Sequence, residues 1–203
     1  MHPSPLKNIF VLRTNISNLK TSKLHWSIEF ARYNTSMDAE KRLLRTIASH
    51  LKAHNLFLAT AESCTGGLLG HLITNLPGSS DYYLGGQIAY SNQAKRLWLN
   101  VPAEILDTYG AVSRETVLAM AHGIRTAFTG EVDFKKIIGL SISGIAGPAG
   151  GTPTKPVGTV WMAISTHIRE RAYHFQFDGS RDAIKSQAAL QALKILSVDI
   201  AAV

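Results

Sequence analysis

The fold of this chain is organised around one stretch, Leu56-Phe57-Leu58-Ala59-Thr60-Ala61-Glu62-Ser63-Cys64-Thr65-Gly66-Gly67. A short apolar run gives way to small and hydroxylated residues and ends on two glycines. Four apolar residues then follow at helical spacing, namely Leu68, Leu69, Leu72 and Ile73. This order predicts a buried strand, a tight turn and the beginning of a helix.

The turn in this stretch is where we expect chemistry. The N–H groups and the positive dipole end of a following helix favour a bound anion or a developing oxyanion. Ser63 and Cys64 both lie in the turn, where a nucleophile is accessible, and the glycines let a ligand approach the backbone. Two plainer interpretations stay open: Ser63 as no more than the helix N-cap, and Cys64 as a small buried apolar residue.

Further helices and strands are predicted on both sides of this stretch. The expected helices begin near Asp38, at Asn92 as N-cap (ending at Leu99), at Pro102 (ending at Gly110), after Ser113 as N-cap, and near Arg181. The other expected strands are Gly86 to Ser91, Ile137 to Ser143, and a hairpin of Thr159 to Ser165 with Arg171 to Phe177. Early alternation of helices and strands with a late hairpin predicts an α/β fold, a three-layer α/β/α sandwich with a mixed, mostly parallel sheet.

Composition is that of a globular domain. The chain has 203 residues, of which 45% are hydrophobic and 17% are charged, enough for one sizeable core. No uninterrupted apolar run is long enough to span a bilayer, so we expect no membrane association. The single cysteine excludes an internal disulfide framework and suits a reducing compartment, which predicts a cytoplasmic location.

The positive charge is concentrated in residues 1–36. This segment holds five Lys or Arg residues against one Glu, and so carries more than half of the net charge of +7. The remaining charge is not gathered in a basic block, and no nucleic-acid-binding module is recognisable, so we expect no nucleic-acid partner. Residues 1–36 are rich in Ser, Thr and Asn and lack periodicity. We therefore predict a poorly ordered extension at 1–36 and a folded domain at 37–203.

A lysine beside a second predicted strand is a candidate base. Tyr90 and Lys95 fall in the run Tyr90-Ser91-Asn92-Gln93-Ala94-Lys95, where the carboxyl end of a strand meets a new helix. Both the helix dipole in that first turn and desolvation in a cleft disfavour an ammonium, which makes a neutral amine available. Such an amine can take the proton of a serine hydroxyl. The alternative is a solvated surface lysine.

Two further clusters follow later strands. The loop from Gly144 to Gly151 lacks both the P-loop and the dinucleotide-binding pattern, yet its free amides could line an anion site; the alternative is an ordinary strand connection. Arg181, at the start of the last helix, suits a phosphate or carboxylate, or else a surface ion pair. His50 and His54 share a helix face without a third ligand at a familiar spacing, so no metal is expected.

Together these runs resemble the CinA C-terminal domain family, whose characterised activity is nicotinamide-nucleotide amidase, here in a stand-alone form. The likeness covers roughly Asp38 to the C-terminus. It is carried by Thr60 to Gly67, Tyr90 to Lys95, Ser143 to Pro148 and Lys155 to Trp161, with support from Tyr109 to Ser113 and Gly179 to Asp182.

The resemblance implies hydrolysis of nicotinamide mononucleotide to nicotinate mononucleotide and ammonia. It implies Ser63 as nucleophile, Lys95 as base, and Tyr90 and Arg181 as supporting active-site residues, with no metal, no cofactor and a homodimer. We expect substrate contacts from Glu62, Thr65, Gly66, Gly67, Asn92, Gly144 and Gly147, with backbone amides near Thr65 and Gly66 holding the oxyanion. The alternative is a non-catalytic binding or interaction protein on the same fold, linked to competence or the damage response.

Overall fold

The computed structural model describes residues 38–201. The chain divides into two units, Met1–Ala39 and Glu40–Val203, and the second unit is described here by itself. The predicted poorly ordered extension at 1–36 lies outside the described residues.

The described part of the chain alternates helices and strands. A first helix runs to residue 53. The strands are β1 (Phe57–Glu62), β2 (Tyr83–Ile88), β3 (Ile137–Gly144), β4 (Thr159–Ser165) and β5 (Glu170–Gln176). The later helices are α2 (Leu68–Thr74), α3 (Asn92–Leu99), α4 (Ala103–Tyr109), α5 (Arg114–Thr126) and α6 (Arg181–Ile200), with short 3-10 turns at Ser79–Asp81 and Phe134–Lys136.

The strands form one mixed sheet in the order β2-β1-β3-β4-β5. β1 pairs in parallel with β2 on one side and with β3 on the other, whereas β4 is antiparallel to both β3 and β5. Four strands therefore run in one direction and only β4 runs against them. The next strand in the chain, β2, lies on one side of β1, and the strand after it, β3, lies on the other. The carboxyl end of β1 is therefore a topological switch point, where open α/β sheets bind their ligands.

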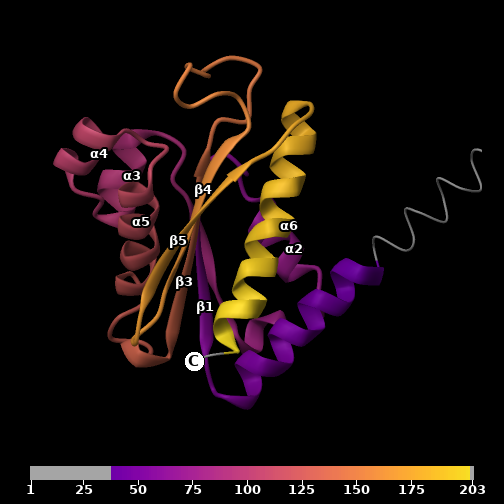
Figure 1. Cartoon of the computed structure of the whole chain (residues 1–203). Helices are drawn as coiled ribbons and strands as arrows, with labels where there is room; N and C mark the ends of the chain where they lie inside the picture. The colour runs from indigo at the N-terminus through magenta and orange to yellow at the C-terminus, as the bar shows by residue number, and fades with distance from the viewer. Residues whose placement is uncertain (1–37, 202–203) are drawn as a thin grey trace, which may run out of the picture. The chain divides into compact units, whose positions relative to one another are not determined.

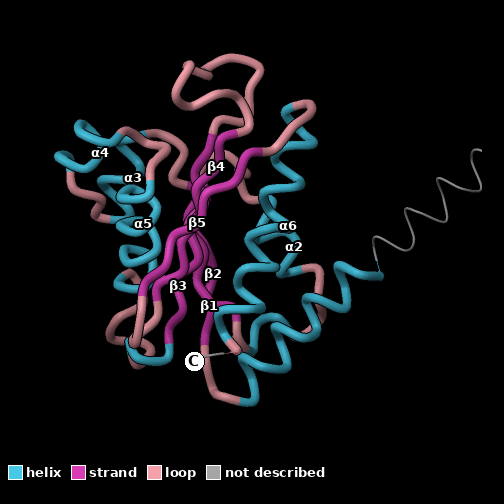
Figure 2. Tube along the Cα trace, in the orientation of Figure 1, coloured by secondary structure: helices cyan, strands magenta, loops and turns pink. Residues whose placement is uncertain are grey.

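Helices cover both faces of the sheet, which gives three layers (Figures 1 and 2). α3, α4 and α5 lie on one face, and α2, α6 and the first helix lie on the other. Alternate residues of β1 serve the two sides: Leu58 packs with the α6 side and Ala59 with the α5 side. Apolar cores therefore lie on both faces of the sheet, because successive side chains of a strand point to opposite faces.

The predicted architecture is confirmed, and most helix boundaries agree with it. Two local predictions are wrong. β2 is Tyr83–Ile88 rather than Gly86 to Ser91, because the chain leaves the sheet once the Ala89 N–H has bonded to the carbonyl of Glu62 (2.8 Å). The N-cap of α3 is Ser91 rather than Asn92: the Ser91 hydroxyl accepts the N–H of Ala94 (3.1 Å).

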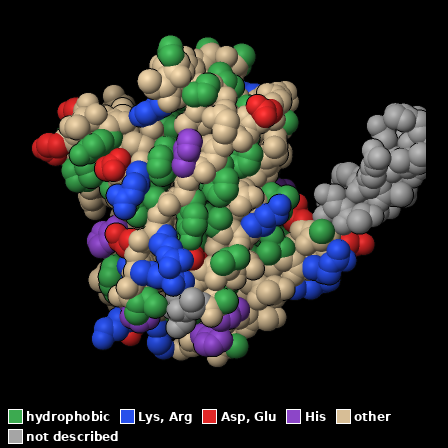
Figure 3. Space-filling model, in the orientation of Figure 1, with side chains coloured by type: hydrophobic (Ala, Val, Ile, Leu, Met, Phe, Trp, Pro, Cys, Tyr) green, Lys and Arg blue, Asp and Glu red, His purple; other side chains and the backbone are tan. Residues whose placement is uncertain are grey.

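The surface of the described part is mixed in character. On the face shown in Figure 3, Lys and Arg side chains lie in several separate places among hydrophobic and uncharged groups. Within residues 38–201, no helix has both the length and the hydropathy needed to cross a membrane.

Candidate active site

The site lies at one edge of the sheet, where four parallel strands end. β1 leads directly into Ser63, β2 into Tyr90, β3 into the loop after Gly144, and β5 into the segment before Arg181. Because these strands run in the same direction, their carboxyl ends meet at the same edge. The sheet therefore gathers four chain segments that are far apart in the sequence.

The turn after β1 is held by a buried carboxylate. Glu62 is 3% exposed and accepts four hydrogen bonds, from the hydroxyl of Thr65 (2.7 Å) and from the N–H groups of Gly67 (2.9 Å), Leu69 (3.1 Å) and Gly70 (2.8 Å). An ionised carboxylate at the beginning of α2 also meets the favourable end of the helix dipole. Glu62 thus fixes the turn that carries Ser63, and its oxygens are occupied by the protein.

Ser63 and Lys95 form a buried pair. The Lys95 Nζ atom lies 3.0 Å from the Ser63 Oγ atom, and the two residues are 1% and 6% exposed. Lys95 also donates to the carbonyl oxygens of Ala89 (2.9 Å) and Tyr90 (3.1 Å). These two carbonyls come from the segment between β2 and α3, so the strand end and the helix together aim the lysine at the serine.

Burial makes the neutral form of Lys95 more accessible than it is in water. Burial lowers the pKa of the Lys95 amine from 10.5 to about 8. A neutral amine has two N–H groups and one lone pair. The two carbonyl acceptors match the two N–H groups, which leaves the lone pair to accept the hydroxyl proton of Ser63. The arrangement therefore suits proton transfer from serine to lysine.

Cys64 is a poor rival to Ser63 as nucleophile. Its side chain is buried within the larger apolar core, and burial raises the pKa of the thiol to about 12. Because the thiolate is the reactive form of cysteine, a thiol with this pKa is unreactive at neutral pH. The structure thus favours the plainer interpretation of Cys64 as a buried apolar residue.

Tyr90 and Arg181 lie together at the open side of the pair. The Arg181 guanidinium donates to the Tyr90 hydroxyl (3.1 Å) and to the carbonyl oxygen of Gly147. Tyr90 is 60% exposed, in contrast to Lys95. This contact joins the segment after β2, the glycine-rich loop and the start of α6 around one opening.

A pocket of about 150 Å³ joins these groups. Its lining includes the four predicted catalytic residues, Cys64, Gly144 and four residues that were not among the predicted site residues: Ala111, Val112, Ser143 and Ala146. The Ser143 hydroxyl donates to the carbonyl of Ala111 (2.7 Å), which ties the end of β3 to the connection between α4 and α5. The runs Tyr109 to Ser113 and Ser143 to Pro148, both part of the family resemblance, contain these four residues.

Most of the other predicted substrate-binding residues are either hydrogen-bonded within the protein or absent from the pocket lining. The Thr65 hydroxyl and the Gly67 N–H are committed to Glu62, and the Gly66 N–H donates to the Ser63 carbonyl (3.1 Å). The Gly66 N–H, one of the amides expected to hold the oxyanion, is thus engaged within the turn, and the oxyanion site stays a prediction. Asn92 is exposed at the first position of α3 and is absent from the pocket lining, whereas Gly147 is buried and binds Arg181 through its carbonyl.

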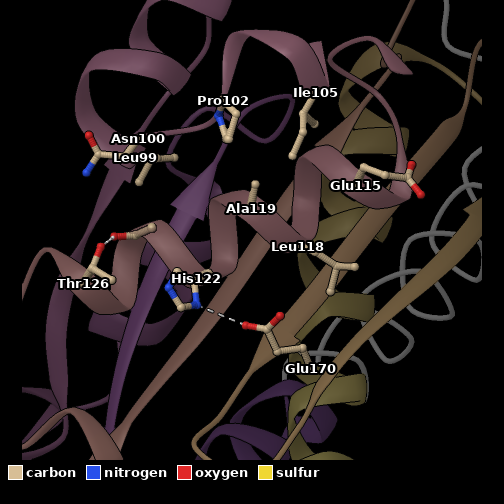
Figure 4. A pocket seen from close by; sticks show the side chains of 11 residues that line it. Leu99, Asn100, Pro102, Ile105, Glu115, Leu118, Ala119, His122, Thr126 and Glu170 are labelled. Atoms are coloured by element: carbon tan, nitrogen blue, oxygen red, sulfur yellow. Dashed lines mark hydrogen bonds and ion pairs between the residues drawn. The ribbon is translucent and has the colours of Figure 1, made fainter. Parts of the chain in front are cut away.

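A larger cavity, of about 710 Å³, lies elsewhere in the domain. It opens between α4, α5 and the beginning of β5, and Figure 4 shows both apolar and polar side chains around it, with His122 and Glu170 in contact at one side (3.3 Å). It shares no lining residue with the Ser63 pocket. Its walls hold no serine, cysteine or lysine.

No metal site is found in the described range 38–201, where no three His, Cys, Asp or Glu side chains are grouped to hold an ion. The predicted sharing of a helix face by His50 and His54 is confirmed, since their rings stack at 4.1 Å. The His54 ring contacts the carbonyl of His50 (2.9 Å).

Comparison with known proteins identifies relatives of this chain. The family model described as the CinA C-terminal domain matches residues 40–200. A CinA-like protein of Syntrophotalea carbinolica is 45% identical over 157 residues, which is 77% of this chain and 37% of that protein. A CinA-like protein of Cytophaga hutchinsonii is 44% identical over 165 residues, which is 81% of this chain and 38% of that protein. The chain thus spans less than two fifths of the length of these curated relatives.

Solved structures match more completely. A competence-damaged protein (CinA) superfamily protein of Klebsiella pneumoniae superposes with a TM-score of 0.74 at 35% identity, covering 81% of this chain and 99% of that one. A competence/damage inducible protein of Agrobacterium tumefaciens superposes with a TM-score of 0.72 at 36% identity, covering 79% and 94%.

Proposed function

Because the chain belongs to the CinA C-terminal domain family, we propose that it is an amidohydrolase, a nicotinamide-nucleotide amidase that uses Ser63 as nucleophile and Lys95 as base. The single observation that carries this proposal is the buried Lys95–Ser63 contact of 3.0 Å, beside two carbonyl acceptors of the same amine. When the amine is neutral, its two N–H groups match the two carbonyls and its lone pair faces the serine proton. The family resemblance supplies the substrate, nicotinamide mononucleotide.

In the first half-reaction, Lys95 takes the hydroxyl proton of Ser63 while the serine oxygen attacks the carboxamide carbon. The carbonyl oxygen of the substrate becomes an oxyanion in the tetrahedral intermediate. Lys95, now an ammonium, returns its proton to the amide nitrogen. The carbon–nitrogen bond breaks, ammonia leaves, and an ester joins the substrate acyl group to Ser63.

In the second half-reaction, Lys95 takes a proton from water, and the resulting hydroxide adds to the ester carbon. The bond between that carbon and the Ser63 oxygen breaks, and Lys95 returns the proton to the serine. The products are nicotinate mononucleotide and the free enzyme. One base with a pKa near the working pH can serve both halves, because it gains and loses its proton readily.

Tyr90 and Arg181 support the reaction from the opening of the pocket. Their mutual contact fixes the guanidinium beside the substrate entrance, where its charge favours an anionic substrate.

Ammonia release from nicotinamide mononucleotide, measured with a coupled enzyme assay, tests the proposal. We expect release by the wild-type chain and none by Ser63→Ala. A wild-type chain that binds the nucleotide without releasing ammonia would instead support a non-catalytic binding protein, in keeping with the competence and damage names of the similar structures.

Three further expectations stay predictions: a homodimer, no nucleic-acid or membrane partner, and a cytoplasmic location as favoured by the single cysteine. Gel filtration, nucleic-acid and vesicle binding assays, and cell fractionation would test them.

A further inference from the structure

Another cavity, of about 420 Å³ and distinct from the larger one beside α5, lies beside the Ser63 turn. Its lining residues are Thr65, Gly66, Gly67, Leu68, His71, Asp182 and Lys185. Cys64 and Arg181 line the Ser63 pocket, and their chain neighbours Thr65 and Asp182 line this one. The two cavities therefore adjoin across the turn and the start of α6.

The Ser63 pocket alone is too small for a nucleotide. Its volume of about 150 Å³ is well below the roughly 300 Å³ at which small-molecule sites usually begin. A substrate larger than a carboxamide on one ring must extend beyond it. The adjoining cavity has the volume to take the remainder of such a molecule.

Lys185 is the one Lys or Arg side chain in the lining of the cavity beside Gly66, and it can bind an anion there. Among residues 38–201 its ammonium makes no hydrogen bond or ion pair with another side chain, and its Nζ atom lies 3.8 Å from the position that a Cβ atom of Gly66 would occupy. The neighbouring N–H groups of Gly66 and Gly67 are committed to Ser63 and Glu62. A bound anion must therefore take its donors from side chains, chiefly from Lys185.

Arg181 is less suited to that task. Its guanidinium already donates to Gly147 and Tyr90, which fixes it at the opening of the first pocket. The Lys155 ammonium, on the glycine-rich loop, is likewise occupied, since it donates to the carbonyl of Tyr109 (2.8 Å).

We propose that the cavity beside Gly66 is the sugar-phosphate subsite of the same active site, with the Lys185 ammonium binding the phosphate. This inference rests on the proposed function. The Asp182 carboxylate, on the same wall, accepts hydrogen bonds from sugar hydroxyls, and His71 lies on the opposite helix as a second donor. The phosphate at Lys185 holds the carboxamide of the same substrate at Ser63, so that remote binding positions the reacting bond.

Binding of ribose 5-phosphate tests the subsite without any chemistry. We would measure its dissociation constant by calorimetry for wild type, Lys185→Ala, Lys185→Arg and the matched control Lys194→Ala, which removes the same charge from an exposed position of α6. A charge-assisted hydrogen bond to phosphate accounts for about 10- to 100-fold in affinity. We expect that loss for Lys185→Ala, much of the affinity to return in Lys185→Arg, and no change for Lys194→Ala.

The outcomes separate the subsite from the proposed function. Wild-type affinity in Lys185→Ala, an equal loss in Lys194→Ala, or no binding by the wild type would overturn the subsite. Ammonia release by the wild type with an unchanged KM for nicotinamide mononucleotide in Lys185→Ala would also overturn it, while leaving the amidase standing. Lys185-dependent binding of ribose 5-phosphate without ammonia release would support the subsite and contradict the amidase.

Discussion

Two buried pairs of a serine and a cation stand at opposite edges of the sheet. At the carboxyl end of β1, Lys95 lies 3.0 Å from Ser63; near the beginning of β3, Arg125 donates to the hydroxyl of Ser165, also at 3.0 Å. All four residues are buried. Burial lowers the pKa of both cations. The two pairs therefore match in distance and burial, and they differ in their other partners and in their access to a pocket.

The Arg125 pair is closed. Its guanidinium also donates to the carbonyls of Ile137, Thr166 and Phe134, and the Ser165 hydroxyl donates to the Glu170 carboxylate (2.6 Å). A guanidinium does not lose its proton in the range where proteins are stable. This pair therefore joins α5 to the sheet and cannot act as a base.

The Lys95 pair is open. Its amine titrates near pH 8, its serine lines a pocket, and that pocket lies where four parallel strands end. A short contact between a serine and a buried cation does not by itself make a nucleophile–base pair. The cation must be able to release its proton, and the serine must be reachable by a substrate.

The largest expected difference is in turnover. Ser63→Ala removes the attacking oxygen, so ammonia release from nicotinamide mononucleotide should fall to background while nucleotide binding stays nearly intact. Ser165→Ala should keep turnover per folded molecule. It should lose about 1–3 kcal/mol of unfolding free energy in urea titrations, because Arg125 and Glu170 each lose a buried partner. Comparable loss of turnover in both variants would contradict the assignment of the Arg125–Ser165 pair to structure and of the Lys95–Ser63 pair to the reaction.

Arg125→Lys tests whether the Arg125 pair has a structural role only. A lysine has three donors and no planar fork, so at least one of the four acceptors of Arg125 is left without a partner. We expect a decrease of about 2–4 kcal/mol in unfolding free energy. Turnover by the folded fraction should match wild type, measured below the shifted melting temperature. An inactive but fully stable variant would assign Arg125 a role in the reaction.

The two cations should also differ in the pH dependence of stability. The pKa of Lys95 is about 8 in the folded chain and 10.5 as its ordinary value, so between these pH values the unfolded state binds more protons. The unfolding free energy of wild type relative to Lys95→Met should therefore rise with pH, by roughly 3 kcal/mol in total. Wild type relative to Arg125→Met should show no such rise. A flat difference for Lys95→Met would contradict the lowered pKa.

The smallest effect is expected at Cys64. Because its thiol is buried with a pKa of about 12, Cys64→Ala removes a packed sulfur and no reactive group. We expect most of the turnover to remain, with a packing loss of about 1 kcal/mol in the unfolding free energy. Loss of turnover in Cys64→Ala, with Ser63→Ala still active, would assign the nucleophile to the thiol.

Much of this arrangement could be predicted from local patterns. The periodicity around Leu56 to Gly67 predicted the strand, turn and helix, and strand-following clusters predicted that Ser63, Tyr90, Lys95 and Arg181 lie at one edge of the sheet. Their assignment as catalytic residues came from the family resemblance and stays a prediction. What placed them together is the direction of the strands, which alternating patterns indicate only in part.

Other features had no local signal. Glu62 stabilises the turn through donors five to eight residues ahead, beyond the three-residue reach of the usual capping motifs. Ser143 and Ala111 form a pocket wall only because β3 and the α4–α5 connection meet in space. Lys185 resembles any surface lysine until the cavity beside Gly66 is seen.

Single-turnover ammonia release from nicotinamide mononucleotide, followed from pH 5 to 10 for wild type, Lys95→Arg and Lys95→Ala, tests whether Lys95 is the base that activates Ser63. A neutral Lys95 acting as base predicts a wild-type rate that rises with pH through one group with a pKa of about 8. Lys95→Arg keeps the charge but has no accessible lone pair, so it should be as inactive as Lys95→Ala at every pH. Substantial release by Lys95→Arg would contradict the claim, since Lys95 would then supply charge rather than base catalysis.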